Sequence, residues 1–124
     1  MSNYLTRKPM DTGWTFVSMA KIEEMKEFVE GPIESFELPL GIHISSNLNA
    51  VLTANYETFS TAIVEEDGDA QPLFGNVFLA SRDQEGNPIP LSQNQIEWLS
   101  NHSRLVQTPT AQLVMKINPF VSYK

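Results

Sequence analysis

The residues best able to do chemistry in this chain begin with its two histidines. His43 and His102 are the only imidazoles in the 124 residues. Neither has a second histidine or a carboxylate at metal-ligand spacing in the sequence. His43 lies between two isoleucines and so on the opposite face of a predicted strand, a position typical of an exposed or locally bonded side chain. We therefore predict no metal site at either imidazole.

Carboxylates gather in residues 65–72, with the sequence EEDGDAQP. Glu65, Asp67 and Asp69 alternate as the oxygen ligands of a calcium loop do. The stretch lacks the twelve-residue EF-hand order and its closing glutamate, so the pattern favours a solvated, exposed acidic loop. The sequence predicts neither a metal nor a cofactor.

Nucleophiles in recognisable motifs are missing as well. The chain has no cysteine, which excludes thiol chemistry and cysteine-based zinc sites. It has neither a Gly-x-Ser-x-Gly elbow nor a Walker-type phosphate loop. We expect no catalytic residue, although members of a Ser-His-Asp triad can lie far apart in a chain, so a small hydrolase stays an alternative.

Asparagines form a second group with possible chemistry. Asn47, Asn49, Asn55 and Asn76 could bind the edge of a purine through paired hydrogen bonds, with Phe74, Tyr56 or Trp98 stacked on the ring. Turns and helix caps also favour asparagine, which explains the first three. Asn76 lies on a predicted apolar strand and has no such explanation, so it is the leading candidate for a ligand contact.

Scattered cations complete the candidates. Arg7, Lys8, Arg82 and Arg104 would meet a phosphate if two subunits brought them together; otherwise they are separate surface charges. Separate surface charges are the favoured interpretation of these four residues, whereas the leading functional hypothesis places a ligand pocket between subunits of a homo-oligomer. The predicted ligand-binding residues are Asn76, Phe74, Gly75, Asn55, Asn47, Arg82 and Arg104.

The elements that position these residues are clearest in residues 73–99. Val77 and Leu79 alternate with Phe74, Phe78 and Ala80, so both faces of a strand are apolar and the strand is expected near the centre of a sheet. Residues 84–88 have the composition of a turn. Ser92 and Gln95 then have capping-box spacing, which predicts the start of a helix.

The rest of the chain predicts an α+β fold. We expect a flexible N-terminal arm over residues 1–12 and a single domain over residues 13–124, with a mostly antiparallel sheet of about five strands and two or three packed helices. The expected helices include residues 19–30, capped by Ser18 and ended by Gly31, and residues 55–64, where a strand is the alternative. The expected strands include residues 13–17, a hairpin over residues 33–44, residues 50–53, and an edge strand over residues 106–119.

Charge and hydropathy narrow the class of partner. The formal net charge of −7 disfavours nonspecific binding to nucleic acid or to an anionic membrane. No apolar run approaches the ~18 residues of a membrane span, and the polar N-terminus lacks the apolar core of a signal peptide. We expect a cytoplasmic protein.

Residues 22–99 resemble a small family of unknown function found in phage genomes and mobile elements. The matching pieces are IEEMKEFVEGPIESFELPLGIHISSNLNA, an asparagine (Asn55) before the next stretch, and LFGNVFLASRDQEGNPIPLSQNQIEWL. The chain differs from the pattern at Tyr56, where a basic residue is expected, and in its long C-terminal strand. The resemblance implies an accessory protein that acts in a bacterial host cell.

Three functions follow as hypotheses. The first is a non-enzymatic protein that counters a bacterial defence system by sequestering a small nucleotide-derived signal. The second is an acidic inhibitor that occupies a basic groove of a host defence enzyme, with nucleic-acid mimicry as one form of this inhibition. The third is a small hydrolase of a nucleotide signal.

Overall fold

The computed structural model describes residues 2–124 and has an α+β fold, as predicted. Its strands number ten rather than about five, and two α-helices accompany them. In chain order the elements are β1 (Ser2–Arg7), β2 (Thr15–Met19), α1 (Ile22–Val29), β3 (Ile33–Glu37), η1 (Pro39–Gly41), β4 (His43–Asn47), η2 (Ala50–Thr53), β5 (Phe59–Val64), β6 (Ala70–Phe74), β7 (Val77–Arg82), β8 (Pro88–Ile89), α2 (Gln93–His102), β9 (Ser103–Gln107) and β10 (Leu113–Ile117).

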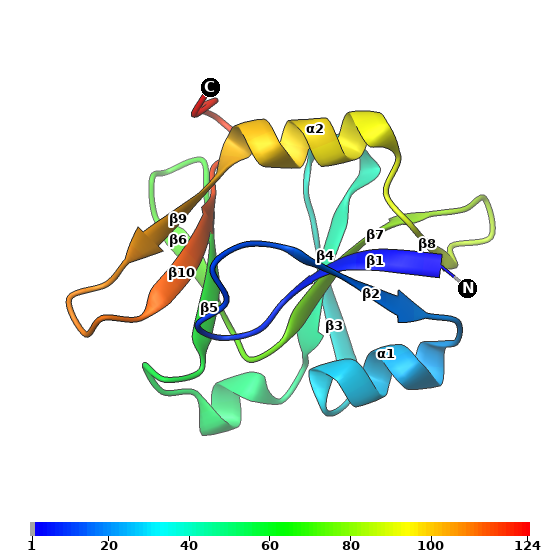
Figure 1. Ribbon diagram of the computed structural model, residues 1–124, viewed down its shortest axis with the longest axis horizontal. Coiled ribbons are helices and arrows are strands. Elements are labelled where there is room, and N and C mark those ends of the chain that lie inside the picture. Colours follow the sequence, from blue (N-terminus) through cyan, green and yellow to red (C-terminus); the bar gives the residue numbers. More distant parts are fainter. Residues whose placement is uncertain (1) are drawn as a thin grey trace.

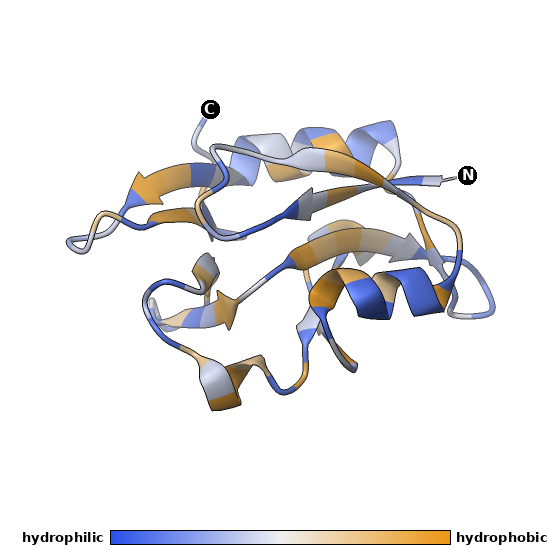
Figure 2. Cartoon of the chain, turned by 60° about the horizontal axis from the view of Figure 1, so that its bottom comes forward, coloured by the Kyte–Doolittle hydropathy of each residue, from blue (hydrophilic) through white to orange (hydrophobic). Residues whose placement is uncertain are grey.

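The strands form two sheets (Figure 1). The first sheet has the order β2-β1-β7-β4-β3, with β8 paired to β7, and all its pairs are antiparallel. The second has the order β6-β5-β10-β9, in which β5 and β10 are parallel. Figures 1 and 2 show α1 and α2 on opposite outer sides, with the strands between them.

Strand β7 lies in the middle of the first sheet and is buried on both faces, as its alternation predicts. Val77 and Leu79 join a core cluster that also holds Ile63 and Ile117 of the second sheet. Phe78 and Ala80 face the other way, into a cluster with α1. The expected strand is nevertheless interrupted, because Gly75 takes a positive φ of 79° and separates β6 in one sheet from β7 in the other.

The segment predicted as a flexible N-terminal arm over residues 1–12 contains a paired strand. Residues 2–7 form β1, which pairs with both β2 and β7. Tyr4, Leu5, Thr6 and Arg7 are buried. Met1, also part of the predicted arm, lies outside the described residues.

Arg7 joins the two sheets. Its side chain is fully buried, with no exposed area. Nε donates to the Ser60 carbonyl of β5 at 2.8 Å, and Nη2 donates to the Leu113 carbonyl of β10 at 2.7 Å. Nη1 donates to the carbonyls of Asp11 and Gly13. The guanidinium thus satisfies carbonyls from three segments far apart in sequence.

Two predictions between residues 50 and 64 are also wrong. The expected helix over residues 55–64 is largely strand β5, and its β-branched residues fit the alternative. Asn55 accepts from the backbone amides of Glu57 and Thr58 in a turn and caps no helix. The expected strand over residues 50–53 is the short 3₁₀ helix η2.

The C-terminal region forms two strands where one was expected. Residues 108–112 form a turn, closed by a bond from the Thr108 amide to the Gln112 carbonyl. Pro109 is therefore in the turn, and β10 lies between β5 and β9 instead of at an edge. Prolines flanking a segment mark its ends but do not say whether its sides are paired.

The two α-helices differ in how well the sequence predicts their ends. Helix α1 begins at Ile22, with Lys21 as N-cap, because Ser18 belongs to β2. Glu30, rather than Gly31, takes the left-handed position at its C-terminus. Helix α2 has the predicted Ser92–Gln95 capping box. Among residues 2–124, no helix has the combination of length and hydropathy that crossing a bilayer requires.

Candidate functional site

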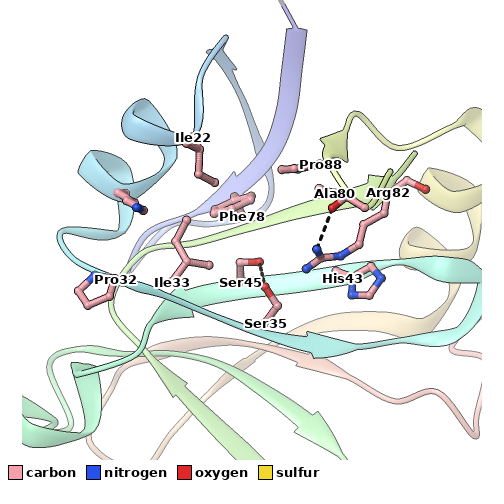
Figure 3. Close-up of a pocket in the computed structure, with 13 residues that line it drawn as sticks. Ile22, Pro32, Ile33, Ser35, His43, Ser45, Phe78, Ala80, Arg82 and Pro88 are labelled. Atoms are coloured by element: carbon pink, nitrogen blue, oxygen red, sulfur yellow. Dashed lines mark hydrogen bonds between the residues drawn. The ribbon is translucent and has the colours of Figure 1, made fainter. Parts of the chain in front are cut away.

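A cavity of about 510 Å³ lies on the face of the first sheet that α1 only partly covers. Figure 3 shows its labelled side chains on α1, on β3, β4 and β7, and at the β7–β8 hairpin. The lining residues are Ile22, Lys26, Pro32, Ile33, Ser35, His43, Ser45, Phe78, Ala80, Ser81, Arg82, Gly86 and Pro88.

The local sequence explains why this face is open. Helix α1 has only eight residues, and it buries Met25 and Val29 against Tyr4 and Phe78. Over β3 and β4, the sheet carries small serines in place of apolar side chains that a helix would cover. The cavity therefore lies beside α1, with polar groups on its β3–β4 side and apolar side chains near the helix.

The strand registers set the order of groups along the cavity. Ser35 is opposite Ser45, which is opposite Phe78 on β7. His43 is opposite Ala80, two residues along the strands, and Arg82 lies beyond it. Ile33 lies in the other direction on β3. Figure 3 shows the same order: Arg82 and His43 at one end, the serines in the middle, and Ile33 with Ile22 at the other end.

Basic side chains concentrate at this cavity although the whole chain is acidic. Arg82 donates from Nη1 to the Gly86 carbonyl at 3.1 Å, which fixes it to the turn of the β7–β8 hairpin. Lys26, on α1, is a second lining cation. No aspartate or glutamate is among the lining residues. The cavity is thus suited to an anion despite the net charge of −7.

His43 lines the cavity in its neutral form at neutral pH. Burial lowers the pKa of its imidazole, and the nearby positive charge of Arg82 lowers that pKa further. The carboxylate of Glu37, opposite His43 on β3, acts in the other direction and is the smallest of the three effects. A neutral imidazole can donate one hydrogen bond and accept another.

The Ser35 and Ser45 hydroxyls form a hydrogen-bonded pair, 2.7 Å apart. Ser45 is buried and Ser35 is exposed. Ser45 Oγ thus pairs with another hydroxyl, and among the described residues no hydrogen bond links it to an imidazole. This arrangement lacks the bonded serine and base of an activated nucleophile.

The structure gives Asn76, the leading candidate, a structural role. Its Nδ2 donates to the Phe28 carbonyl near the C-terminus of α1 at 2.8 Å. That carbonyl belongs to the last turn of the helix, where acceptors lack partners within the helix. Asn76 therefore ties α1 to the start of β7. Asn76 lies in the short link between β6 and β7, not on the predicted strand, and a long-range cap of this kind leaves no sign in the local sequence.

The other predicted residues do not come together at one site. Of the predicted ligand-binding residues, only Arg82 lines the cavity of about 510 Å³. Phe74, Gly75 and Asn47 line a separate hollow of about 100 Å³, where the Asn47 amide donates to the Glu30 carbonyl and its oxygen accepts from the Asn49 amide. Asn55 is engaged in its own turn.

The predicted cations are also separated. The guanidinium carbon of Arg104 lies 4.8 Å from the centre of the Tyr123 ring. Lys8 lies over the Phe28 ring, and Arg7 is enclosed between the sheets. Arg82 shares its cavity with Lys26 and His43 of the same chain, so this cavity requires no second subunit.

Most of the lining residues were not among the predicted ligand-binding residues, notably Lys26, Ser35, Ser45 and Phe78. One signal was available: on β4, His43 and Ser45 alternate with the buried Ile42 and Ile44, which puts both polar side chains on one face. Joining that face to Arg82 and α1 requires the pairing of β4 with β7, which no local pattern provides.

Residues 2–124 contain no group of three or more histidine and carboxylate side chains placed to hold a metal ion. Comparison of the chain with protein-family models, with curated proteins and with solved structures found no match. The geometry of the cavity therefore carries the functional argument.

Proposed function

We propose that this protein binds a small nucleotide-derived anion in the cavity between α1 and β3, β4 and β7, and acts by sequestering it without catalysis. The observation that carries the proposal is the placement of Arg82, Lys26 and His43 around one cavity of a chain whose net charge is −7. A long-range negative field would repel an anion, so a local cluster of basic groups favours one binding position.

The mixed lining supports a ligand with a charged end and a less polar end. A volume of about 510 Å³ is within the range of small-molecule sites. Arginine matches the geometry of a phosphate, and the end of the cavity lined by Ile22 and Ile33 can accept a flat or apolar group. A nucleotide has both parts.

The proposed setting rests on the resemblance to proteins of phages and mobile elements that we expect from the sequence of residues 22–99. In a bacterial cytoplasm, a protein that removes a nucleotide signal would prevent the response which that signal activates. The proposal therefore includes a role against host defence, with the signal as the partner.

Titration calorimetry with cyclic mononucleotides, cyclic dinucleotides and cyclic ADP-ribose isomers tests this function. At least one should bind with a stoichiometry near one per chain, because the cavity is formed within a single chain. Absence of binding by every compound would contradict the proposal. Recovery of the bound compound intact after denaturation separates sequestration from the hydrolase alternative.

An acidic inhibitor is the second candidate function. Glu65, Glu66, Asp67 and Asp69 are all exposed in the β5–β6 turn, so this charge is available to a basic groove. Salt-sensitive binding of a host nuclease that is lost on neutralising these four carboxylates, and unchanged in Arg82→Gln, would favour the inhibitor.

A further inference from the structure

The Ser35–Ser45 hydroxyl pair has one hydrogen-bond donor more than the bond between the two hydroxyls requires. Two hydroxyls carry two protons, and the bond between the Oγ atoms uses one of them. No hydrogen bond from either hydroxyl to another group is found among the described residues. One donor is therefore left for solvent or for a ligand in the cavity that both residues line.

Burial indicates which hydroxyl has the remaining donor. Ser45 is 4% exposed, whereas Ser35 is exposed. A buried donor without an acceptor is unfavourable, so burial favours Ser45 as the donor to Ser35 and leaves the Ser35 hydroxyl to donate to solvent or to a ligand in the cavity. This arrangement selects for a hydrogen-bond acceptor above the pair.

The registers place this donor between the two ends of the cavity. Successive residues on one face of a strand are about 7 Å apart. His43 lies one such step from Ser45 towards Arg82, and Ile33 lies one step from Ser35 in the opposite direction. A ligand with phosphate at Arg82 would place its next polar segment over the serines.

Resting on the proposed function, we infer that the ligand contains a nucleoside monophosphate unit in one orientation. Its phosphate contacts Arg82 and His43, a 2′- or 3′-hydroxyl of its sugar accepts a hydrogen bond from the serine pair, and its base lies against Ile22 and Ile33. Ser35 and Ser45 are then specificity-determining residues that distinguish a nucleotide from a simple anion of the same charge.

The test uses adenosine 5′-monophosphate, its 2′,3′-dideoxy analogue and inorganic phosphate with the full chain. The protein variant is Ser35→Ala/Ser45→Ala, because after a single substitution the remaining hydroxyl could still donate. Removing both partners leaves no unsatisfied hydroxyl, so the fold should be retained. Ser46→Ala is the matched control, since Ser46 is equally buried on β4 but does not line this cavity.

The wild-type protein should bind the monophosphate more tightly than inorganic phosphate. The double variant should bind it about tenfold more weakly, the ordinary effect of one hydrogen bond, and Ser46→Ala should bind as the wild type does. For the dideoxy analogue, the wild-type protein and the double variant should bind alike, because the acceptor is absent.

Equal binding of the monophosphate by the wild type and the double variant would overturn the inference, and so would failure of the wild type to bind it. Binding of a cyclic nucleotide in either case would leave the proposed function standing. Failure of every nucleotide would contradict both.

Discussion

Arg7 shows how a charged side chain in the sequence can be a central packing element. It was a candidate phosphate contact, but its guanidinium donates four hydrogen bonds to backbone carbonyls, including one from each of β5 and β10. Burial lowers the pKa of its guanidinium, an effect that the charge of Asp11 partly offsets. Desolvation is tolerated because the donors are paired.

Replacing Arg7 with leucine should lower the free energy of unfolding by about 3 kcal/mol or more, because several buried carbonyls lose their partners. Urea denaturation followed by circular dichroism measures this. Arg104→Leu is the control and should cost less than about 1 kcal/mol, since that side chain is exposed. Similar losses in both variants would contradict the role of Arg7.

Asn76 provides a second test at the residue scale. Asn76→Ala should lower the free energy of unfolding by about 1 kcal/mol, because the Phe28 carbonyl loses its donor. Asn76→Asp should cost more, since a carboxylate cannot donate and is repelled at a helix C-terminus. Thermal denaturation gives the order of stability, and calorimetry should show nucleotide affinity unchanged. Weaker nucleotide binding with normal stability would instead make Asn76 a ligand contact.

At the scale of single residues, the sequence could show the type of each residue and the face of the strand on which its side chain lies. The alternation of β4 placed His43 opposite its isoleucine neighbours, and the structure confirms this. The partners of Asn76 and Arg7 could not be predicted, because they lie 48 residues away in one case and up to 106 in the other. Such contacts depend on tertiary pairing, which leaves little trace in local composition.

At the scale of elements, the sequence predicted correctly a motif whose contacts all lie within a few consecutive residues. The Ser92–Gln95 capping box needs only four consecutive residues, and it was predicted correctly. Strand β5 was predicted as a helix because Tyr56, Phe59 and Ile63 have helical spacing. Sheet pairing with β6 and β10 decided the outcome in favour of a strand. Local periodicity is a weak guide when both readings fit.

Gln95 links the α2 cap to the first sheet. Its Oε1 accepts from the Ser92 amide, while Nε2 donates to the Leu40 carbonyl at 2.8 Å and to Ser81 Oγ at 3.1 Å. Gln95→Glu retains the acceptor for the cap but loses the donor. It should lower the free energy of unfolding at pH 7 by about 2 kcal/mol.

The pH dependence of Gln95→Glu separates the donor from the cap. A protonated carboxyl can donate to the Leu40 carbonyl, so the deficit relative to the wild type should shrink as pH falls towards the ordinary glutamate value of about 4.3. Urea denaturation at pH 4.5 and pH 7 measures both deficits. A pH-independent deficit would contradict donation by residue 95 as the stabilising contact.

At the scale of the whole molecule, the distribution of charge matters more than its sum. The acidic composition disfavours a large basic surface, but it does not reveal that Arg82, Lys26 and His43 line one cavity. That group comes from β7, α1 and β4, which are brought together only by the order of the first sheet. The cavity could not be predicted without that topology.

Nucleotide affinity should rise as pH falls from about 7.5 to 5.5. In the free protein the pKa of His43 is below its ordinary value, so the imidazole is neutral at pH 7. A bound anion favours the imidazolium, so the complex takes up a proton, and affinity increases as the solution becomes more acidic. Calorimetry in buffers with different ionisation heats counts this proton.

His43→Gln is the matched variant for that titration. It keeps a polar side chain without a titrating group, so its nucleotide affinity should vary less over the same pH range. Without ligand, the free energy of unfolding of the wild-type protein should also fall as pH drops below 6.5. The pKa of His43 is lower in the folded state than in the unfolded chain, so the unfolded chain takes up a proton first. An identical pH profile of affinity in His43→Gln would contradict contact between His43 and the anion.

The most direct test compares Arg82→Gln with Arg104→Gln by calorimetry, using whichever nucleotide in the panel binds the wild type most tightly. Both variants remove one positive charge, but only Arg82 lines the cavity. Arg82→Gln should weaken binding tenfold or more, the order expected for a lost charged hydrogen bond, while Arg104→Gln should change affinity by less than about twofold. Equal losses in the two variants, or none in Arg82→Gln, would contradict anion binding at this cavity.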